Sequence, residues 1–264
     1  MASFVGLNSS SQPSLRFEDA ELETKLDPIV HVVLVGEGGV GKSTMCEALV
    51  GGVGAASTLA TKYKQTIGLY IHETKLWLPN KLNKVELRVW DVGGHTLRNK
   101  LATNYLFYAD AILFVYDITH VGSFSTLTTW LKRVRATFDV EDAAQPGVRD
   151  RRLPFLGLIA NKCDLEYMRT VEQERHDSFA KLNNFHMDMF LSALSPEDVM
   201  QCFLKVASQV TGVRLVSRHD QAIVSRISTR RTTRMLLKPS QAIDEEEDGA
   251  TQQEEGGARQ CLLL

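Results

Sequence analysis

A glycine-rich octapeptide near the start of the chain has the residue types and the spacing of a phosphate-binding loop. The segment GEGGVGKS, residues 36–43, fits the pattern GxxxxGK[ST], in which glycines let several backbone N–H groups point at one anion. Lys42 would place a positive charge at the β- and γ-phosphates, and the Ser43 hydroxyl would bind Mg²⁺. The other residues expected to bind the phosphates are Gly36, Gly38, Gly39, Val40, Gly41 and Thr44.

A second segment has the chemistry to select the base. The sequence NKCD, residues 161–164, follows an apolar run of strand length, and in open α/β sheets ligands lie at the carboxyl ends of the strands. Asp164 would accept hydrogen bonds from N1–H and the 2-amino group of guanine, and against adenine it would be left unpaired. Asn161 and Lys162 complete the segment, with the Lys162 stem over the ring, and Ser192-Ala193 would offer a backbone N–H to the guanine oxygen. The pattern favours a guanine nucleotide and disfavours an ATP-using P-loop kinase.

The elements that must position these segments alternate between strand and helix. Short apolar runs at 29–35, 111–117 and 153–160 predict buried parallel strands, and residues 71–91 alternate around a turn as a β-hairpin does. Helical spacing follows at 123–138 and 196–212, with a last short strand from residue 187. This order predicts an α/β fold with a mostly parallel sheet, one antiparallel edge hairpin, and helices on both faces.

The 264-residue chain is predicted to contain one domain with an extension at each end. Residues 1–27 are polar and predict a flexible N-terminal extension, 28–213 form the nucleotide-binding domain, and 214–264 carry opposite charge blocks that predict a disordered tail. The formal net charge of −2 gives no global attraction to nucleic acid. The four cysteines are scattered, which argues against a disulfide framework or a zinc site. The chain shows neither a secretory signal nor an apolar run long enough to cross a bilayer.

In combination these segments resemble the Ras superfamily of small GTPases. GEGGVGKST, YKQTIG, WDVGG, NKCD and SA occur in the superfamily's order, over about residues 29–213. LFVYDIT and the C-terminal cysteine are most similar to the Rab family, and KQTIGL, WDVGGHT, DLEYMRT and KVASQVTG to its divergent Rab twenty-eight branch. The Arf group shares WDVGG and stays an alternative, but it relies on an N-terminal glycine for lipidation, where this chain has Ala2.

The resemblance implies roles for further residues. Thr66 corresponds to the threonine that completes Mg²⁺ coordination and senses the γ-phosphate, Asp91 to the aspartate that reaches Mg²⁺ through water, and Gly94 to the glycine that contacts the γ-phosphate. An effector surface is implied at Ile71, Trp90 and Tyr105, although the first of these is normally aromatic. The resemblance also implies an exchange factor, a GTPase-activating protein and effectors as partners of a monomer.

His95 stands where most such switches have the glutamine that orients the attacking water. A neutral imidazole would position water through one nitrogen, whereas an imidazolium would not accept the proton of that water. The other interpretation is a loop histidine that points away from the site. We therefore expect slow intrinsic hydrolysis, assisted by Lys42, Gly94 and His95, and a bias toward the GTP state. A GTP-binding scaffold with negligible hydrolysis is the alternative.

The last four residues predict a lipid anchor. Cys261-Leu262-Leu263-Leu264 fits C-a-a-X with a terminal leucine, which is typical of geranylgeranylation at Cys261. One prenyl chain needs a second signal for stable anchoring, and the nearest flank is acidic, so we expect reversible attachment and a cytosolic pool held by a prenyl-binding solubiliser. The resemblance implies vesicle traffic on the cytoplasmic face of membranes, with endosomes or the base of the cilium as candidates.

Overall fold

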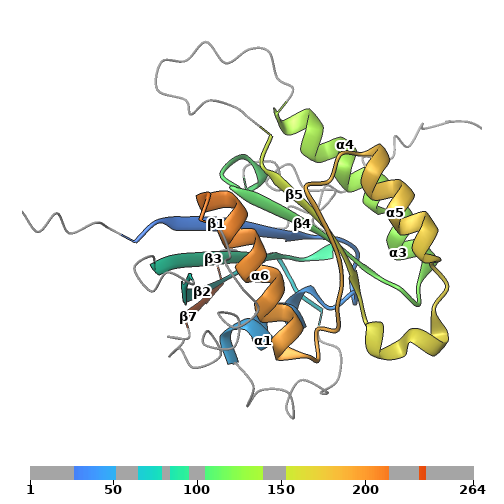
Figure 1. Ribbon diagram of the computed structural model, residues 1–264, viewed down its shortest axis with the longest axis horizontal. Helices are drawn as coiled ribbons and strands as arrows, with labels where there is room; N and C mark the ends of the chain where they lie inside the picture. Colours follow the sequence, from blue (N-terminus) through green and yellow to red (C-terminus); the bar gives the residue numbers. More distant parts are fainter. Residues whose placement is uncertain are drawn as a thin grey trace, which may run out of the picture.

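The computed structural model describes residues 27–51, 65–78, 84–94, 105–138, 153–213 and 232–235. Within them the strands form one seven-stranded sheet in the order β6-β5-β4-β1-β3-β2-β7 (Figure 1). The strands β1, β3, β4, β5 and β6 pair in parallel, whereas β2 is antiparallel to β3 and to β7. Their bounds are β1 Ile29–Val35, β2 Leu69–Trp77, β3 Lys84–Val92, β4 Ala111–Asp117, β5 Phe155–Asn161, β6 Met187–Phe190 and β7 Thr232–Met235. The predicted mixed sheet and its hairpin are confirmed.

Helices cover both faces of the sheet. On one face lie α1 and α6, and on the other lie α3, α4 and α5 (Figure 1). Their bounds are α1 Lys42–Gly51, α3 Val121–Ser125, α4 Leu127–Phe138, α5 Gln173–Leu182 and α6 Pro196–Thr211, and a 3₁₀ segment spans Cys163–Met168. The arrangement is the three-layer α/β architecture that alternating strands and helices predict.

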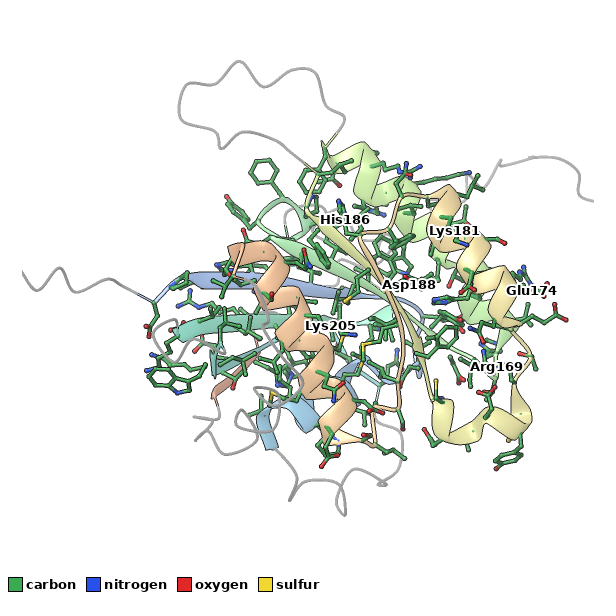
Figure 2. All side chains as sticks on the ribbon, viewed as in Figure 1. Arg169, Glu174, Lys181, His186, Asp188 and Lys205 are labelled. Carbon is green, nitrogen blue, oxygen red and sulfur yellow. The ribbon has the colours of Figure 1, made fainter. Side chains whose placement is uncertain are left out.

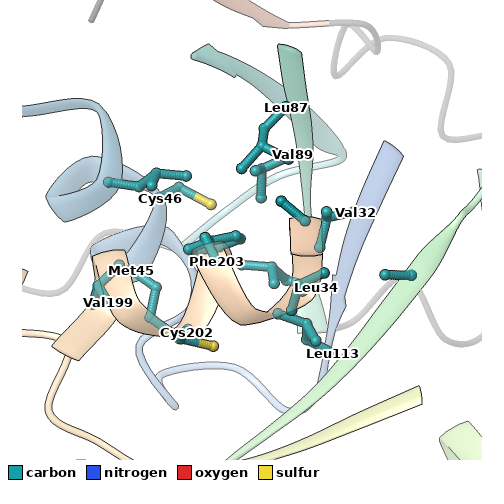
Figure 3. Packing of buried hydrophobic residues seen from close by; sticks show 14 of the residues in the cluster. Val32, Leu34, Met45, Cys46, Leu87, Val89, Leu113, Val199, Cys202 and Phe203 are labelled. Atoms are coloured by element: carbon teal, nitrogen blue, oxygen red, sulfur yellow. The ribbon is translucent and has the colours of Figure 1, made fainter. Parts of the chain in front are cut away.

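The continuous apolar run of β1 is explained by the two layers of helices. Val32 and Leu34 belong to the core that α1 and α6 cover, whereas Val33 and Val35 belong to the core on the opposite face. Figure 3 shows part of the first core, with Phe203 from α6 next to Leu34 of this strand. Since successive side chains of a strand point to opposite faces, a strand covered on both faces carries apolar residues on both of them rather than at alternate positions.

Two helical predictions need correction. The spacing predicts one helix over 123–138, but α3 ends at Ser125 and α4 begins at Leu127. The hydroxyls of Ser123 and Thr126 donate to the carbonyls of His120 and Ser123, and such side-chain bonds compete with helical ones. Helix α5 was not predicted, because within it only His176 and Ala180 are buried. By contrast α6 ends as predicted, with Gly212 in the left-handed conformation at φ 72°.

The strand β7 lies inside the segment for which the sequence predicts a disordered tail. Residues 232–235 pair antiparallel with residues 70–73 of β2, with Arg234 opposite Ile71. The prediction is therefore wrong for these four residues. The physical reason is the edge of the sheet: an edge strand presents unpaired N–H and C=O groups, and a short segment with two threonines is suited to pair with them.

Candidate nucleotide-binding site

The phosphate loop connects the carboxyl end of β1 to the first residue of α1, as its motif requires. Gly41 precedes the helix with φ 98°, and a Cβ atom there would lie 2.2 Å from Nδ2 of Asn161. A side chain at this position would therefore push the two loops apart. The Lys42 ammonium folds back over the loop and donates to the carbonyl oxygens of Gly36 at 2.9 Å and Glu37 at 2.7 Å. The loop is thus closed around the cation that would meet the phosphates.

Lys42 is a buried cation, with 5% of the residue exposed. Burial lowers its pKa from 10.5 to about 8, while the nearby carboxylate of Asp91 acts in the opposite direction. A lysine with such a pKa is partly neutral in mildly alkaline solution. A polyanion bound in the loop would stabilise the protonated form.

Three oxygen-bearing side chains from distant parts of the chain meet beside this lysine. The Ser43 hydroxyl donates to Oδ2 of Asp91 at 2.6 Å and lies 2.8 Å from the hydroxyl of Thr66. The second carboxylate oxygen of Asp91, Oδ1, is buried and has no hydrogen-bond partner within the described part of the chain. Hard oxygen donors of this kind suit Mg²⁺, which keeps several water ligands, and an orphaned carboxylate oxygen is a natural acceptor for one of those waters. The residues therefore fit the predicted magnesium site.

The DVGG segment at the end of β3 lies directly against the phosphate loop. A Cβ atom on Gly94 would lie 2.3 Å from the backbone nitrogen of Gly38, so only glycine allows this approach. Gly93 donates to the carbonyl of Gly68 at 3.0 Å, which ties the segment to the start of β2. The backbone of Gly94 is thereby held beside the loop that is predicted to bind the phosphates.

The side chain of Asn161 joins the phosphate loop to the base-binding segments. Its Nδ2 group donates to the carbonyl of Val40 at 2.7 Å, and its Oδ1 accepts from the backbone N–H of Ala193 at 2.8 Å. Asn161 is fully buried. The N–H of Ala193, which we expect to face the guanine oxygen, already has this acceptor and would have to share its hydrogen between the two oxygens.

The other residues predicted to bind the base are held by an ion pair and by hydrogen bonds. The Nζ of Lys162 lies 2.6 Å from Oδ2 of Asp117, and Asp164 accepts from the Ser192 hydroxyl at 2.5 Å. Burial alone would raise the pKa of Asp117, but hydrogen bonds from Lys162 and Thr119 lower it on balance. Lys162 has φ 67°, a left-handed conformation that turns the chain sharply after β5.

Asp117 was not predicted as a site residue. Its signal was present, because it is the last residue of the strand that pairs with β5, where it lies opposite Asn161. Carboxyl ends of parallel strands meet at one edge of a sheet, so a charged residue that closes an apolar strand is a candidate for the site. Its contribution is to fix the position of Lys162.

The residues predicted as an effector surface are neighbours. Ile71 and Trp90 are opposite each other in the β2–β3 ladder, and the rings of Trp90 and Tyr105 pack edge to face with centroids 5.8 Å apart. His31 of β1 adds a third ring, 5.9 Å from Trp90, which the sequence did not suggest. His95 and Cys261, by contrast, lie outside the described residues, so the structure does not test their predicted roles.

Comparisons of the sequence with known proteins identify the family of the chain. The family model described as Ras family matches residues 31–212. The Ras-related protein Rab-28 of Caenorhabditis elegans is 30% identical over 189 residues, which cover 72% of this chain and 70% of that protein. The Ras-related protein Rab-1C of Dictyostelium discoideum is 29% identical, with 78% of this chain and 92% of that protein covered. The GTP-binding protein ypt3 of Schizosaccharomyces pombe is also 29% identical, with coverages of 75% and 82%.

Proposed function

The chain belongs to the Ras family of small GTPases, with Rab proteins among its relatives, and from this membership we propose that it binds GTP and GDP with Mg²⁺ as a Rab-like switch. The single observation that best supports the proposal is the side chain of Asn161. It hydrogen-bonds to the phosphate loop on one side and to the segment after β6 on the other. One buried residue thus couples the place where phosphates would bind to the place where guanine would bind.

The reaction of such a switch is hydrolysis of the phosphoanhydride bond of GTP. Water attacks the γ-phosphorus, the bond to the β-phosphate oxygen breaks, and GDP and inorganic phosphate result. When bound, Mg²⁺ supplies charge neutralisation at the β- and γ-oxygens. The Lys42 ammonium and the Gly94 N–H would stabilise the same charge from the protein side. His95 would orient the water.

A second function, a GTP-dependent scaffold with negligible hydrolysis, is favoured by one observation. The chain has histidine at the position where the family's switches carry the water-orienting glutamine. If the imidazole does not reach the water, the protein stays in its GTP state until a partner supplies the missing group. Binding without turnover would then be its activity.

The proposed attachment to a membrane involves the C-terminal end of the chain. Within the described residues, no helix is long and apolar enough to span a bilayer. We propose geranylgeranylation of Cys261, reversible attachment to the cytoplasmic face of a membrane, and a prenyl-binding solubiliser for the cytosolic pool. The exchange factor, the GTPase-activating protein and the effectors would act at two switch segments, near residues 63–70 and 92–105, with effectors on Ile71, Trp90 and Tyr105. Substitution of Cys261 by serine should abolish membrane association.

The test of the proposed function is base selectivity. Displacement of a fluorescent GDP by GTP and by ATP should show a preference for GTP of at least about a thousandfold, because the Asp164 carboxylate would be left unpaired against adenine. Asp164→Asn replaces an acceptor by a donor, and xanthosine triphosphate carries a carbonyl where guanine has its 2-amino group. This variant should weaken GTP binding at least about a hundredfold and improve binding of xanthosine triphosphate.

Glu174→Gln is the matched control, because it removes an exposed carboxylate of α5 that lies outside the site. It should leave all three affinities unchanged. Equal displacement by ATP and GTP in the unmodified protein would overturn the proposal.

A further inference from the structure

A buried histidine lies among carboxylates near β6, at the opposite edge of the sheet from β2 and β7. His176, on α5, is fully buried, and its Nε2 atom has no hydrogen-bond partner in the described part of the chain. Buried polar atoms are almost always hydrogen-bonded, so an orphaned imidazole nitrogen requires an explanation. Nothing in the nucleotide chemistry uses this residue.

Two carboxylates converge on that nitrogen. Oδ2 of Asp188, on β6, lies 3.8 Å from Nε2, beyond hydrogen-bond distance. Asp177 is the third member, and one ligand atom from each of the three residues lies within 4.8 Å of the others. Figure 2 shows Asp188 beside the helix that carries Glu174 and Lys181. The three groups therefore connect an edge strand to the helix that covers it.

The opposite nitrogen of the ring is already used for orientation. Nδ1 of His176 lies 3.0 Å from the hydroxyl of Tyr116, which is itself buried. Metal-binding histidines usually carry such a partner on the second nitrogen, because it fixes the ring and the tautomer. Burial also lowers the pKa of His176, so the ring is held in the neutral form that a metal requires.

The cation near the cluster is Arg169, and its charge is paired with the carboxylate of Glu166. The positive charge of Arg169 acts on His176 in the same direction as burial. Arg169 forms two hydrogen bonds of 2.6 Å to the carboxylate of Glu166, however, so its charge is largely neutralised by a partner outside the cluster. The carboxylates of Asp177 and Asp188 have no comparable cation on them among the described ion pairs.

We propose that Nε2 of His176 and the carboxylates of Asp177 and Asp188 form a binding site for Zn²⁺, with water as the fourth ligand. One imidazole and two carboxylates suit zinc, whereas Mg²⁺ and Ca²⁺ prefer oxygen alone. Zinc binds its ligands at about 2.0–2.2 Å, so the carboxylates must close in by roughly an ångström. The Asp188 side chain is 53% exposed and has the freedom to do so.

The ion would fasten α5 to the edge strand β6. This site contains none of the nucleotide-binding residues, and the proposal does not depend on the proposed function. The spacing of the cysteines argues only against a zinc site with cysteine ligands, and the proposed site has none. The site is also invisible as a linear motif, because Asp188 lies on a different element from the other two ligands.

The test is calorimetric titration of the full chain with Zn²⁺, in the presence of saturating GDP and excess Mg²⁺ so that the nucleotide site is occupied. Asp188→Asn changes an exposed residue and should preserve the fold. It should weaken the zinc site at least about tenfold, because even an indirect partner of a metal ligand is worth that much. His176→Gln should do the same, and Glu174→Gln, on the same helix, should bind zinc as the unmodified protein does. Zinc should also raise the midpoint of thermal unfolding in the unmodified protein and not in Asp188→Asn.

Two results would overturn the proposal. One is a titration of the unmodified protein with no zinc binding. The other is zinc binding that Asp188→Asn leaves unchanged, which would place the ion at other side chains such as free thiols. Loss of folding in His176→Gln would leave the comparison of Asp188→Asn with Glu174→Gln as the deciding measurement.

Discussion

Nδ2 of Asn161 donates a hydrogen bond of 2.7 Å to the carbonyl oxygen of Val40, so two loops far apart in the sequence share one buried contact. Asn161→Ala would leave this carbonyl and the N–H of Ala193 without partners. Each unsatisfied group costs about 1–3 kcal/mol. We expect the affinity for GDP to fall about 10- to 100-fold, since about 1.4 kcal/mol corresponds to a factor of ten.

The dissociation rate of a fluorescent GDP measures this loss. Asn183→Ala is the matched control, because that side-chain amide also donates to a backbone carbonyl, at the end of α5 and away from the site. If both variants release GDP at the same rate, the contact with Val40 has no role in nucleotide binding.

The affinity for nucleotide should fall as the solution becomes alkaline. Burial holds the pKa of Lys42 at about 8 in the free protein, and bound phosphates would raise it. Above pH 8 the free protein has lost this proton and must take it up again on binding, so the affinity decreases with pH, by about tenfold between pH 7 and pH 9. Calorimetry in two buffers of different ionisation enthalpy would detect the uptake. Lys42→Arg keeps its charge and should show a flat profile, and a flat profile in the unmodified protein would contradict the assignment.

Removal of the metal should accelerate nucleotide release. The oxygens of Ser43, Thr66 and Asp91 meet at one point, and Oδ1 of Asp91 is buried without a partner. Chelation of Mg²⁺ with EDTA should therefore speed GDP dissociation at least about tenfold, because the charge on the phosphates loses its counter-ion. Ser43→Ala should release GDP quickly already with Mg²⁺ present and should respond less to EDTA. An unmodified protein that ignores EDTA would rule out a metal at this place.

Single-turnover hydrolysis of preloaded GTP decides between the enzyme and the scaffold. We expect the unmodified protein to be slow and His95→Gln to be faster, at least about tenfold, since water positioning is one of the few tasks this reaction leaves to a side chain. Both proteins are measured side by side without any activating protein. If the unmodified protein is inert and the glutamine variant hydrolyses GTP, the protein is a scaffold because of His95. If the unmodified protein hydrolyses GTP as fast as the glutamine variant, the enzyme interpretation holds and the expected cost of His95 is contradicted.

The main elements of the fold follow from local patterns, and the exceptions have local causes. Strands such as β1 and β4 are recognisable because helices cover both their faces and nearly all of their positions are apolar. Helix α5 has no clear apolar pattern in the sequence, because most of its side chains face solvent, including Glu174 and Lys181. Strand β7 was not predicted because it is stabilised by pairing with the edge of β2, and the sequence of the tail does not show this partner.

The sequence predicts the candidate site as a set of residues, and the structure adds the contacts among them. The phosphate loop and NKCD are linear motifs whose chemistry can be read from the residue types. The bond from Asn161 to Val40 and the pair of Asp117 with Lys162 join separate loops, so they appear only when the sheet brings the strand ends together. Likewise the close approach of Gly94 to Gly38 explains a glycine that the sequence alone assigns only by resemblance.

The pairing of β7 with β2 sets how far the body of the protein can stand from a membrane. If Cys261 carries the lipid, 26 residues connect it to Met235 on the sheet, against 48 residues from the end of the domain at Val213. At about 3.3–3.6 Å per residue, the longest possible separation shrinks from roughly 160–170 Å to roughly 90 Å. The departure point also moves from the end of α6 to the edge strand next to Ile71, so the surface expected to meet effectors would be turned toward the bilayer side.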